Sequence, residues 1–98
     1  SWEVREDYAA VPDLLEKVRR KWNVGVLLLW YPLLPDARHA GMLARLEASF
    51  PGALRHEVRF PPARPGHGMA GSGLFLVNPP WRAEERLAWL GARFAALR

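Results

Sequence analysis

Val24-Gly-Val-Leu-Leu-Leu-Trp-Tyr31 is the stretch that decides the fold, because it is apolar throughout and shows no alternation. A strand has this composition when helices cover both of its faces, as they do in a parallel sheet. Pro32 and Pro35 follow, and we expect them to end the strand in a rigid loop. The stretch therefore predicts a buried strand of an α/β protein.

Three helices are expected around this strand, and each has one apolar stripe at helical spacing. The first, with Pro12 in its first turn, carries the stripe Leu14, Leu15, Val18 and Trp22. The second, with Asp36 as its N-cap, carries the stripe Met42, Leu43, Leu46 and Phe50. The third, after Pro80, carries the stripe Leu87, Leu90, Phe94 and Leu97. These stripes should face the sheet.

Two further strands are expected. Residues 53–60 alternate between apolar and charged side chains, which predicts a half-exposed strand at or near the edge of a sheet. Residues 61–68 form a loop rich in proline and glycine, and residues 73–78 form a short apolar strand. The order helix, strand, helix, strand, loop, strand, helix is half of a doubly wound domain. We therefore expect residues 1–98 to be a partial domain that lacks the first half of the sheet.

Composition narrows the possible chemistry. The chain contains no cysteine, which excludes disulfides, thiolate catalysis and cysteine-ligated zinc. His39, His56 and His67 are widely spaced, so no metal site is expected. No apolar run approaches the roughly 20 residues that span a bilayer, so no membrane partner is expected either. The net charge of +4 favours phosphate-rich partners such as nucleic acids.

Asn78-Pro79-Pro80-Trp81 is the most informative short motif. Methylation of an exocyclic amine needs acceptors for both N–H protons, and a side-chain oxygen with a proline-fixed carbonyl could supply them. An aromatic ring can then stack on a base that has left its helix. The alternative is that Asn78 caps a helix, that the two prolines form its first turn, and that Trp81 is a core residue.

A wider resemblance rests on three blocks of sequence. These are Ser1-Trp-Glu-Val-Arg-Glu-Asp-Tyr8, Leu29-Trp-Tyr-Pro32, and Gly68-Met-Ala-Gly-Ser-Gly-Leu-Phe-Leu-Val-Asn-Pro-Pro-Trp81. In their order and spacing they resemble the 23S ribosomal RNA adenine-N6 methyltransferase J family. Members of that family have also been labelled as required for catabolism of external DNA.

The resemblance implies the C-terminal half of a Rossmann-like class I methyltransferase sheet, with mixed strands and flanking helices. It also implies a cytoplasmic enzyme that uses S-adenosylmethionine to methylate adenine in large-subunit ribosomal RNA. Trp2 would be the aromatic of the catalytic Asp-Pro-Ser-aromatic loop, whose Asp and Pro would precede residue 1. Asn78 would then belong to a second, later element and not be the catalytic acceptor.

No cofactor site is expected within this sequence. The glycines at positions 66, 68, 71 and 73 precede a strand, whereas a nucleotide-binding glycine loop follows one. We therefore expect no S-adenosylmethionine binding and no turnover from these residues alone.

The remaining candidate residues are contacts to RNA. They are Trp30, Tyr31, Arg55, Arg59, Arg64, Asn78 and Trp81. Two other interpretations stay open at this point. One is a non-catalytic nucleic-acid binding module connected with the use of external DNA. The other is a different amino-methyltransferase of permuted order, in which Asn78-Pro79-Pro80-Trp81 is the catalytic loop.

Overall fold

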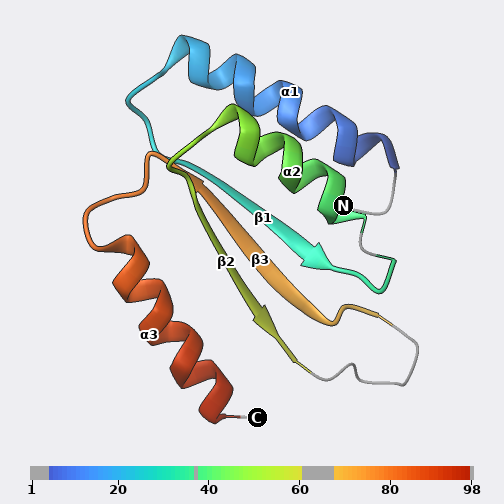
Figure 1. The fold of residues 1–98 in the computed structure, drawn as a ribbon, viewed down its shortest axis with the longest axis vertical. Coiled ribbons are helices and arrows are strands. Elements are labelled where there is room, and N and C mark those ends of the chain that lie inside the picture. The colour runs from blue at the N-terminus through green and yellow to red at the C-terminus, as the bar shows by residue number, and fades with distance from the viewer. Residues whose placement is uncertain (1–4, 37, 61–67, 98) are drawn as a thin grey trace.

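A computed structural model describes residues 5–36, 38–60 and 68–97 of the chain. The elements, in order, are α1 (Arg5–Lys21), β1 (Leu27–Leu33), α2 (His39–Ser49), β2 (Leu54–Arg59), β3 (Gly71–Val77) and α3 (Ala83–Ala96). Figure 1 shows helices α1 and α2 on one side of a small sheet and α3 on its other side. The α/β class predicted from the sequence is confirmed.

The sheet has the strand order β1-β3-β2, and β3 runs antiparallel to both of its neighbours. Strands β1 and β2 therefore point in the same direction. The last strand in the sequence lies in the centre, which explains its continuous apolar composition. The alternating strand β2 lies at the edge, as its sequence predicts.

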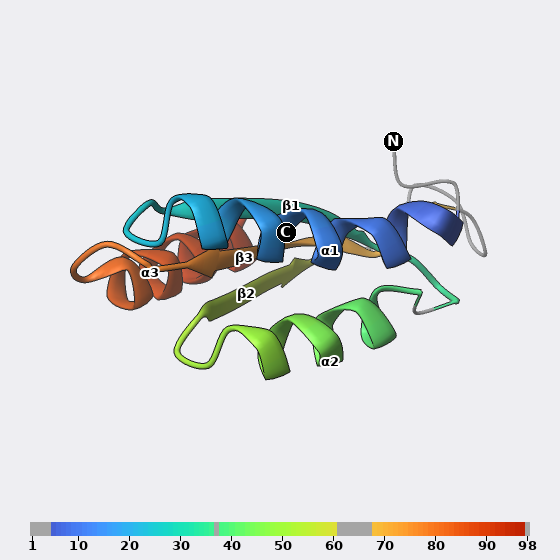
Figure 2. The ribbon, with the colours of Figure 1, turned by 90° about the horizontal axis from the view of Figure 1, so that it is seen from above.

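The core lies between the sheet and the helix pair α1 and α2, which run along the same face of the sheet (Figure 2). The apolar stripe of α2 is confirmed, since Leu43 and Leu46 are almost fully buried. In α1 the predicted stripe is wrong in part, because Leu14 is 59% exposed and Trp22 follows the end of the helix. The helix begins before Pro12, and its buried line runs through Tyr8, Val11, Pro12 and Leu15.

The proline at position 32 does not end β1, contrary to the sequence-based expectation. Leu33 O accepts a hydrogen bond from Ala70 N at 2.8 Å, so Leu33 directs its backbone groups toward β3. Its neighbour Pro32 therefore turns its missing N–H to the other side, where no strand pairs with β1 in the described part of the chain. A proline is compatible with a strand at such a free edge.

Helix α2 begins at His39, later than an N-cap at Asp36 would allow. Arg38 occupies the cap position, and Asp36 Oδ1 accepts a hydrogen bond from Arg38 N at 3.2 Å. Asp36 therefore stabilises the turn before the helix and does not cap the helix itself.

Helices do not cover both faces of β1, which corrects the interpretation of its apolar sequence. Leu28 is 61% exposed and Trp30 is 45% exposed, while Tyr31 and Leu33 on the opposite face are buried. Helix α3 covers the sheet mainly over β2. The outer face of β1 is therefore uncovered at Leu28 and Trp30 among the residues described, although Pro32 further along the same face is buried.

Candidate functional site

The sheet has two ends with different composition. Strands β1 and β2 both finish at one end, here called the carboxyl end, where helices α1 and α2 also begin (Figure 1). Strand β3 finishes at the opposite end, because it is antiparallel to both neighbours. The candidate residues from the sequence are divided between these two ends.

A polar contact crosses the sheet toward its carboxyl end. The Tyr31 side chain is fully buried, and its hydroxyl donates a hydrogen bond to Glu57 Oε2 at 2.8 Å. Tyr31 and Glu57 both pair with Gly73 in the register of the sheet. A Cβ atom at Gly73 would lie 2.2 Å from the Tyr31 ring. The missing side chain of Gly73 is therefore what allows the phenol to reach across the central strand.

Charged partners complete this contact. Arg55 Nε donates to Glu57 Oε2 at 3.0 Å, and Arg55 Nη1 donates to Glu47 Oε1 at 2.8 Å. Burial, and then the neighbouring Glu57 carboxylate, raise the pKa of Tyr31 above its usual range. Burial alone would raise the pKa of Glu57, but hydrogen bonds from Tyr31 and Arg55 outweigh it and lower that pKa. The phenol thus stays protonated while the carboxylate stays ionised.

His39 adds an imidazole to the same region. It is the first residue of α2, and its ring stacks on the Tyr31 ring with a centroid distance of 6.0 Å. The side chain is 8% exposed, and its Nδ1 has no hydrogen-bond partner within the described part of the structure. This cluster of Tyr31, Glu57 and His39 was not predicted as a group. The one feature of the sequence that could have pointed to this cluster was Glu57, the single acidic residue of the predicted edge strand.

The opposite end of the sheet holds the Asn78-Pro79-Pro80-Trp81 loop. Asn78 Nδ2 donates to Asn23 O and to Gly25 O, both at 3.0 Å. Asn78 and Arg82 have φ values of 54° and 65°, so a left-handed residue stands on each side of Pro79, Pro80 and Trp81. The Asn78 amide nitrogen thus fastens this loop to the segment between α1 and β1.

Trp81 is not a core residue, because it is 84% exposed. The Arg82 guanidinium lies over the indole ring, 5.0 Å from the ring centroid. Asn78 does not cap α3 either, since Arg82 occupies the position before that helix. The alternative that we gave for this motif is therefore wrong on both residues.

The structure does not bring the predicted substrate residues together. Tyr31 and Arg59 belong to the carboxyl-end halves of β1 and β2, whereas Asn78 and Trp81 lie beyond the far end of β3. Trp30 points to the face of the sheet opposite to Tyr31. Trp2 and Arg64, also predicted as site residues, lie outside the described residues.

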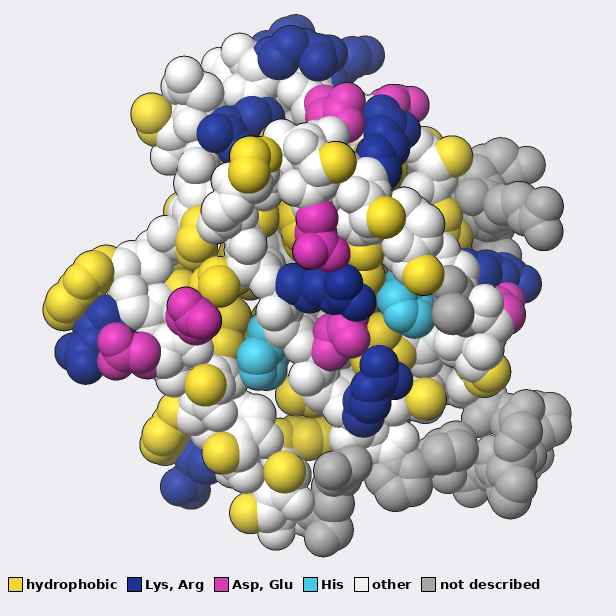
Figure 3. Space-filling model, in the orientation of Figure 1, with side chains coloured by type: hydrophobic (Ala, Val, Ile, Leu, Met, Phe, Trp, Pro, Cys, Tyr) yellow, Lys and Arg dark blue, Asp and Glu magenta, His cyan; other side chains and the backbone are white. Residues whose placement is uncertain are grey.

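The arginines predicted to contact RNA already have carboxylate partners. Arg55 pairs with Glu47 and Glu57, and Arg59 Nη2 lies 3.5 Å from Glu57 Oε1. Figure 3 shows acidic and basic side chains interspersed over the face of the molecule that it draws. The positive net charge of the chain is therefore not gathered into one basic patch on this face.

The described glycines around β3 have packing and turn roles. Gly71 and Gly73 lie within β3, where Cβ atoms would meet Val58 O and the Tyr31 ring, each at 2.2 Å. Gly68, with a φ of 79°, precedes the same strand. These glycines serve turns and close packing, and no glycine-rich turn after a strand is present in residues 5–36, 38–60 and 68–97.

The described residues contain neither a metal-binding cluster nor a membrane-spanning helix. No group of three or more His, Cys, Asp or Glu side chains in them could hold a metal ion. None of the helices formed by these residues has the length and apolar character needed to cross a membrane.

Comparison with known proteins identifies the family. The family model described as "Ribosomal RNA large subunit methyltransferase D, RlmJ" matches residues 1–96. The chain belongs to this family. The resemblance inferred from its three sequence blocks is confirmed.

Two relatives carry the name Ribosomal RNA large subunit methyltransferase J. The relative from Escherichia coli (strain K12) is 30% identical over 97 residues, which cover 94% of this chain and 35% of the relative. The relative from Haemophilus influenzae (strain ATCC 51907 / DSM 11121 / KW20 / Rd) is 28% identical over 87 residues, covering 88% of this chain and 31% of the relative. The chain thus spans about a third of the length of these relatives.

A solved structure has the same fold. The crystal structure of protein LPL1258 from Legionella pneumophila str. Philadelphia 1 superimposes with a TM-score of 0.86 and is 24% identical in sequence. The match covers 96% of this chain and 35% of that protein.

Proposed function

We propose that residues 1–98 form the C-terminal part of a longer methyltransferase that acts on large-subunit ribosomal RNA. Membership of the family and the names of both relatives support this reaction class. The finer assignment is a Rossmann-like class I enzyme that transfers a methyl group from S-adenosylmethionine to N6 of adenine, and it rests on the resemblance of the sequence blocks. A ribosomal RNA substrate would place the protein in the cytoplasm.

One observation carries the proposal, namely the direction of the strands. Helices α1 and α2 begin where β1 and β2 end. In open α/β sheets, ligands bind beyond the carboxyl ends of the parallel strands. In the sequence, Ser1 and Trp2 lie a few residues before α1, which begins at Arg5, and this proximity supports assigning a catalytic loop that ends in Trp2 to the same end of the sheet.

At this end of the sheet, catalysis would consist mainly in positioning the base for methyl transfer. The adenine would leave its helix, and its ring would stack on Trp2. An Asp side-chain oxygen and a Pro carbonyl preceding Ser1 would accept hydrogen bonds from the two N–H groups of the exocyclic amine, which aims the nitrogen lone pair at the methyl group. The transfer would release S-adenosylhomocysteine and one proton of the amine. S-adenosylmethionine would supply the methyl group from a site outside the residues described.

The antiparallel direction of β3 argues against the permuted-loop alternative. A loop after β3 lies at the opposite end of the sheet, about 20 Å away for a strand of seven residues. The Asn78 amide nitrogen is also occupied by two backbone carbonyls. These contacts support a role for Asn78 in holding the fold.

The alternative of a non-catalytic nucleic-acid binding module has less support. The observation in favour of this module was the basic net charge of the chain. However, Arg45, Arg55 and Arg82 are each paired with a carboxylate. Binding to phosphates would have to compete with these ion pairs. The arrangement therefore favours the methyltransferase reading over electrostatic binding of DNA.

The experiment compares the 98-residue chain with a longer polypeptide, in which the chain replaces the matched third of the Escherichia coli relative. We expect no heat of S-adenosylmethionine binding from the chain alone. We expect transfer of a labelled methyl group to unmodified 23S ribosomal RNA from the longer polypeptide. Tight cofactor binding by the isolated chain, or a folded longer polypeptide without transfer, would contradict the proposal. Strong, salt-dependent DNA binding by the isolated chain would favour the module.

A further inference from the structure

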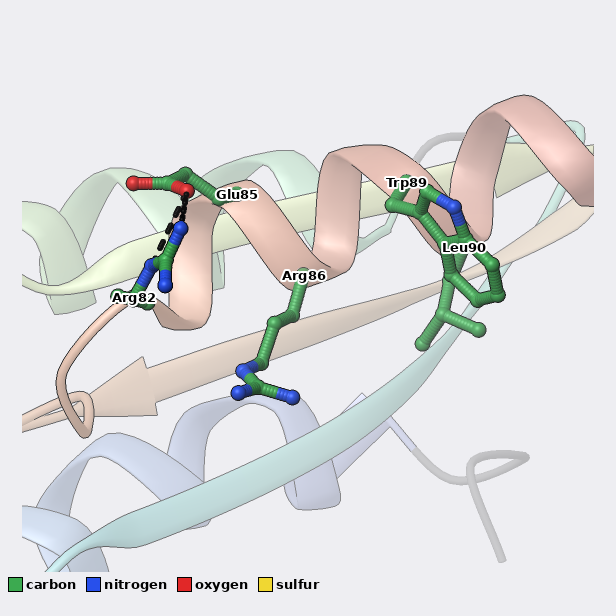
Figure 4. Close-up of a pocket in the computed structure, with 5 residues that line it drawn as sticks. All are labelled: Arg82, Glu85, Arg86, Trp89 and Leu90. Atoms are coloured by element: carbon green, nitrogen blue, oxygen red, sulfur yellow. Dashed lines mark hydrogen bonds and ion pairs between the residues drawn. The ribbon is translucent and has the colours of Figure 1, made fainter.

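Helix α3 and the carboxyl end of the sheet each carry polar side chains without a role in the proposed mechanism. Along α3 lies a cavity of about 570 Å³ (Figure 4), lined by Arg82, Glu85, Arg86, Trp89 and Leu90. All five residues come from α3 or from the position before it, so this cavity is a feature of one helix flank. The cluster of Tyr31, Glu57 and His39 instead draws on β1, β2 and α2. A contact that joins three elements sets how they lie relative to one another.

The two rings of this cluster are enclosed in the protein. The Tyr31 side chain is fully buried, which leaves no ring surface for contact with RNA. The His39 side chain, which stacks on it, is 8% exposed. Any effect of the cluster on a reaction therefore has to pass through the backbone that these side chains hold.

The residues of the cluster are unfavourable choices for stability alone. Gly73 lies inside the central strand, where glycine weakens a sheet. The buried phenol of Tyr31 needs a partner for its hydroxyl, whereas phenylalanine would fill the same space without one. His39 Nδ1 is buried without a hydrogen-bond partner among the described residues. Departures of this kind from local stability rules concentrate at functional sites.

The cluster fixes the backbone at the carboxyl end of the sheet. Tyr31 lies two residues before the end of β1, and His39 is the first residue of α2. Their stacked rings therefore close the loop that joins β1 to α2. The hydrogen bond from Tyr31 to Glu57, at 2.8 Å, ties the same strand to β2 across Gly73. One buried phenol thus holds the ends of two parallel strands and the start of a helix.

Helix α1 is tied to α2 in turn. Arg45 of α2 pairs with Asp13 and Glu16 of α1. Ser49 Oγ donates to Glu16 Oε2 at 2.8 Å. In the proposed function the catalytic loop precedes α1, so a shift at the start of α2 would be passed to the helix that follows this loop. A misplacement of about 1 Å at the reacting groups can slow an enzyme about 100-fold.

We propose that Tyr31 and Glu57 are positioning residues for methyl transfer, which hold the carboxyl ends of β1 and β2 and the start of α2 in place without touching RNA. This inference rests on the proposed function and adds a role within it. Loss of the contact should slow the transfer step, whereas affinity for RNA, which comes largely from phosphate contacts, should hardly change. Loss of a direct RNA contact would instead raise KM.

Steady-state kinetics of the longer polypeptide described above separate positioning from binding. Tyr31→Phe removes the hydroxyl and keeps the ring, so kcat should fall about tenfold or more, while KM for 23S ribosomal RNA stays within about twofold. Asn78→Ala is the control, because it loosens the opposite end of the sheet and should leave both constants close to those of the wild type. Rates are compared at equal concentrations of folded protein. An unchanged kcat in Tyr31→Phe, a rise in KM alone, or an equal fall of kcat in Asn78→Ala would overturn the proposal.

The partnership between the two residues has its own readout. Glu57→Ala should lower kcat as Tyr31→Phe does. The double variant should be no slower than Glu57→Ala alone, because both changes remove the same hydrogen bond. Glu57→Gln should recover most of the loss, since its side-chain oxygen can still accept the bond from the phenol. Losses that multiply in the double variant, or a Glu57→Gln enzyme as slow as Glu57→Ala, would refute the inference.

Amide hydrogen exchange in the 98-residue chain tests the positioning without methyl transfer. Ala70 N donates to Leu33 O at the carboxyl end, at 2.8 Å. Ala53 N donates to Phe50 O at the opposite end, at 3.1 Å, and serves as the internal control. Tyr31→Phe should speed exchange at Ala70 several-fold and leave Ala53 unchanged. Unchanged exchange at Ala70, or equal acceleration at both amides, would count against the inference.

The kinetic and exchange results can fail separately. A longer polypeptide that is folded but transfers no methyl group would defeat the proposed function, and the exchange result would be unaffected. Normal transfer by the wild type together with unchanged exchange at Ala70 in Tyr31→Phe would defeat the positioning role alone.

Discussion

The two ends of the sheet differ in the roles of their polar residues. The carboxyl end combines the starts of two helices with a buried polar contact between Tyr31 and Glu57. The opposite end carries a loop with two prolines, two left-handed residues and an exposed Trp81. The second end has the more conspicuous sequence, yet the amide of Asn78 is used to hold backbone segments together. The direction of a strand thus decides whether a motif at its end can belong to a site.

The contact at the carboxyl end depends on Gly73, and its substitution should have the largest effect on stability. In Gly73→Ala the new methyl group would have to displace the Tyr31 ring, with an expected cost of about 1–3 kcal/mol. Gly41→Ala is the matched control, because no atom lies within 4 Å of its added Cβ in a helix. That control should stabilise the protein by about 0.5–1 kcal/mol. Urea unfolding measures both, and equal values would refute the role of Gly73.

At the opposite end, Asn78→Ala should have the next largest effect. It removes both hydrogen bonds of the amide nitrogen and places alanine at a φ of 54°, with an expected cost of about 1–2 kcal/mol. Asn78→Gly removes the same hydrogen bonds but accepts the left-handed backbone, so it should cost less. Identical unfolding midpoints for wild type and both variants would show that the loop is not fastened in this way.

Acid should weaken the carboxyl end through Glu57. Its pKa is lowered in the folded protein, so its contribution to stability is complete above the pKa of the unfolded chain and is lost as the pH falls through the folded value. The loss should begin below roughly pH 5, where an unfolded carboxyl group starts to bind protons. Glu57→Gln should flatten this acid limb, and Tyr31→Phe should flatten it in part. The measurement is the free energy of unfolding between neutral and acid pH, and an unchanged slope in Glu57→Gln would contradict the assignment.

The smallest change is expected from Trp81→Ala. The side chain is exposed, and its described contact is the Arg82 guanidinium over the ring. The free energy of unfolding should change by only about 0.5 kcal/mol, the scale of an exposed cation–π contact. A loss as large as that of Asn78→Ala would mean that Trp81 supports the fold, and that the contrast between the two ends is drawn wrongly.

Much of the fold could be predicted from the sequence. The order of the elements, the stripe of α2 and the edge position of β2 follow from periodicity alone. The start of α1 was missed, because Pro12 was assigned to a first turn whereas it packs within the helix. The end of β1 was missed because Pro32 is tolerated only where its missing N–H faces no partner, and that depends on the sheet.

The candidate site was less predictable. Asn78 and Trp81 were noticed as a motif, but no local pattern reveals that β3 is antiparallel and places them away from the carboxyl ends of β1 and β2. The partnership of Tyr31 with Glu57 joins residues 26 positions apart across a third strand. It depends on the register at Gly73, which a single sequence does not specify. An uninterrupted apolar run predicted cover on both faces of β1, but a side chain's hydrophobicity does not show which polypeptide covers it.

The most direct test of the central claim compares the two ends by their effect on methyl transfer. In the longer polypeptide, Trp2→Ala and Asn78→Ala are measured at equal concentrations of folded protein with 23S ribosomal RNA. Trp2→Ala should reduce kcat/KM about tenfold or more, as expected when a stacking platform for a base is lost. Asn78→Ala should leave kcat/KM close to that of the wild type. The opposite result, with turnover abolished by Asn78→Ala and retained by Trp2→Ala, would contradict the account.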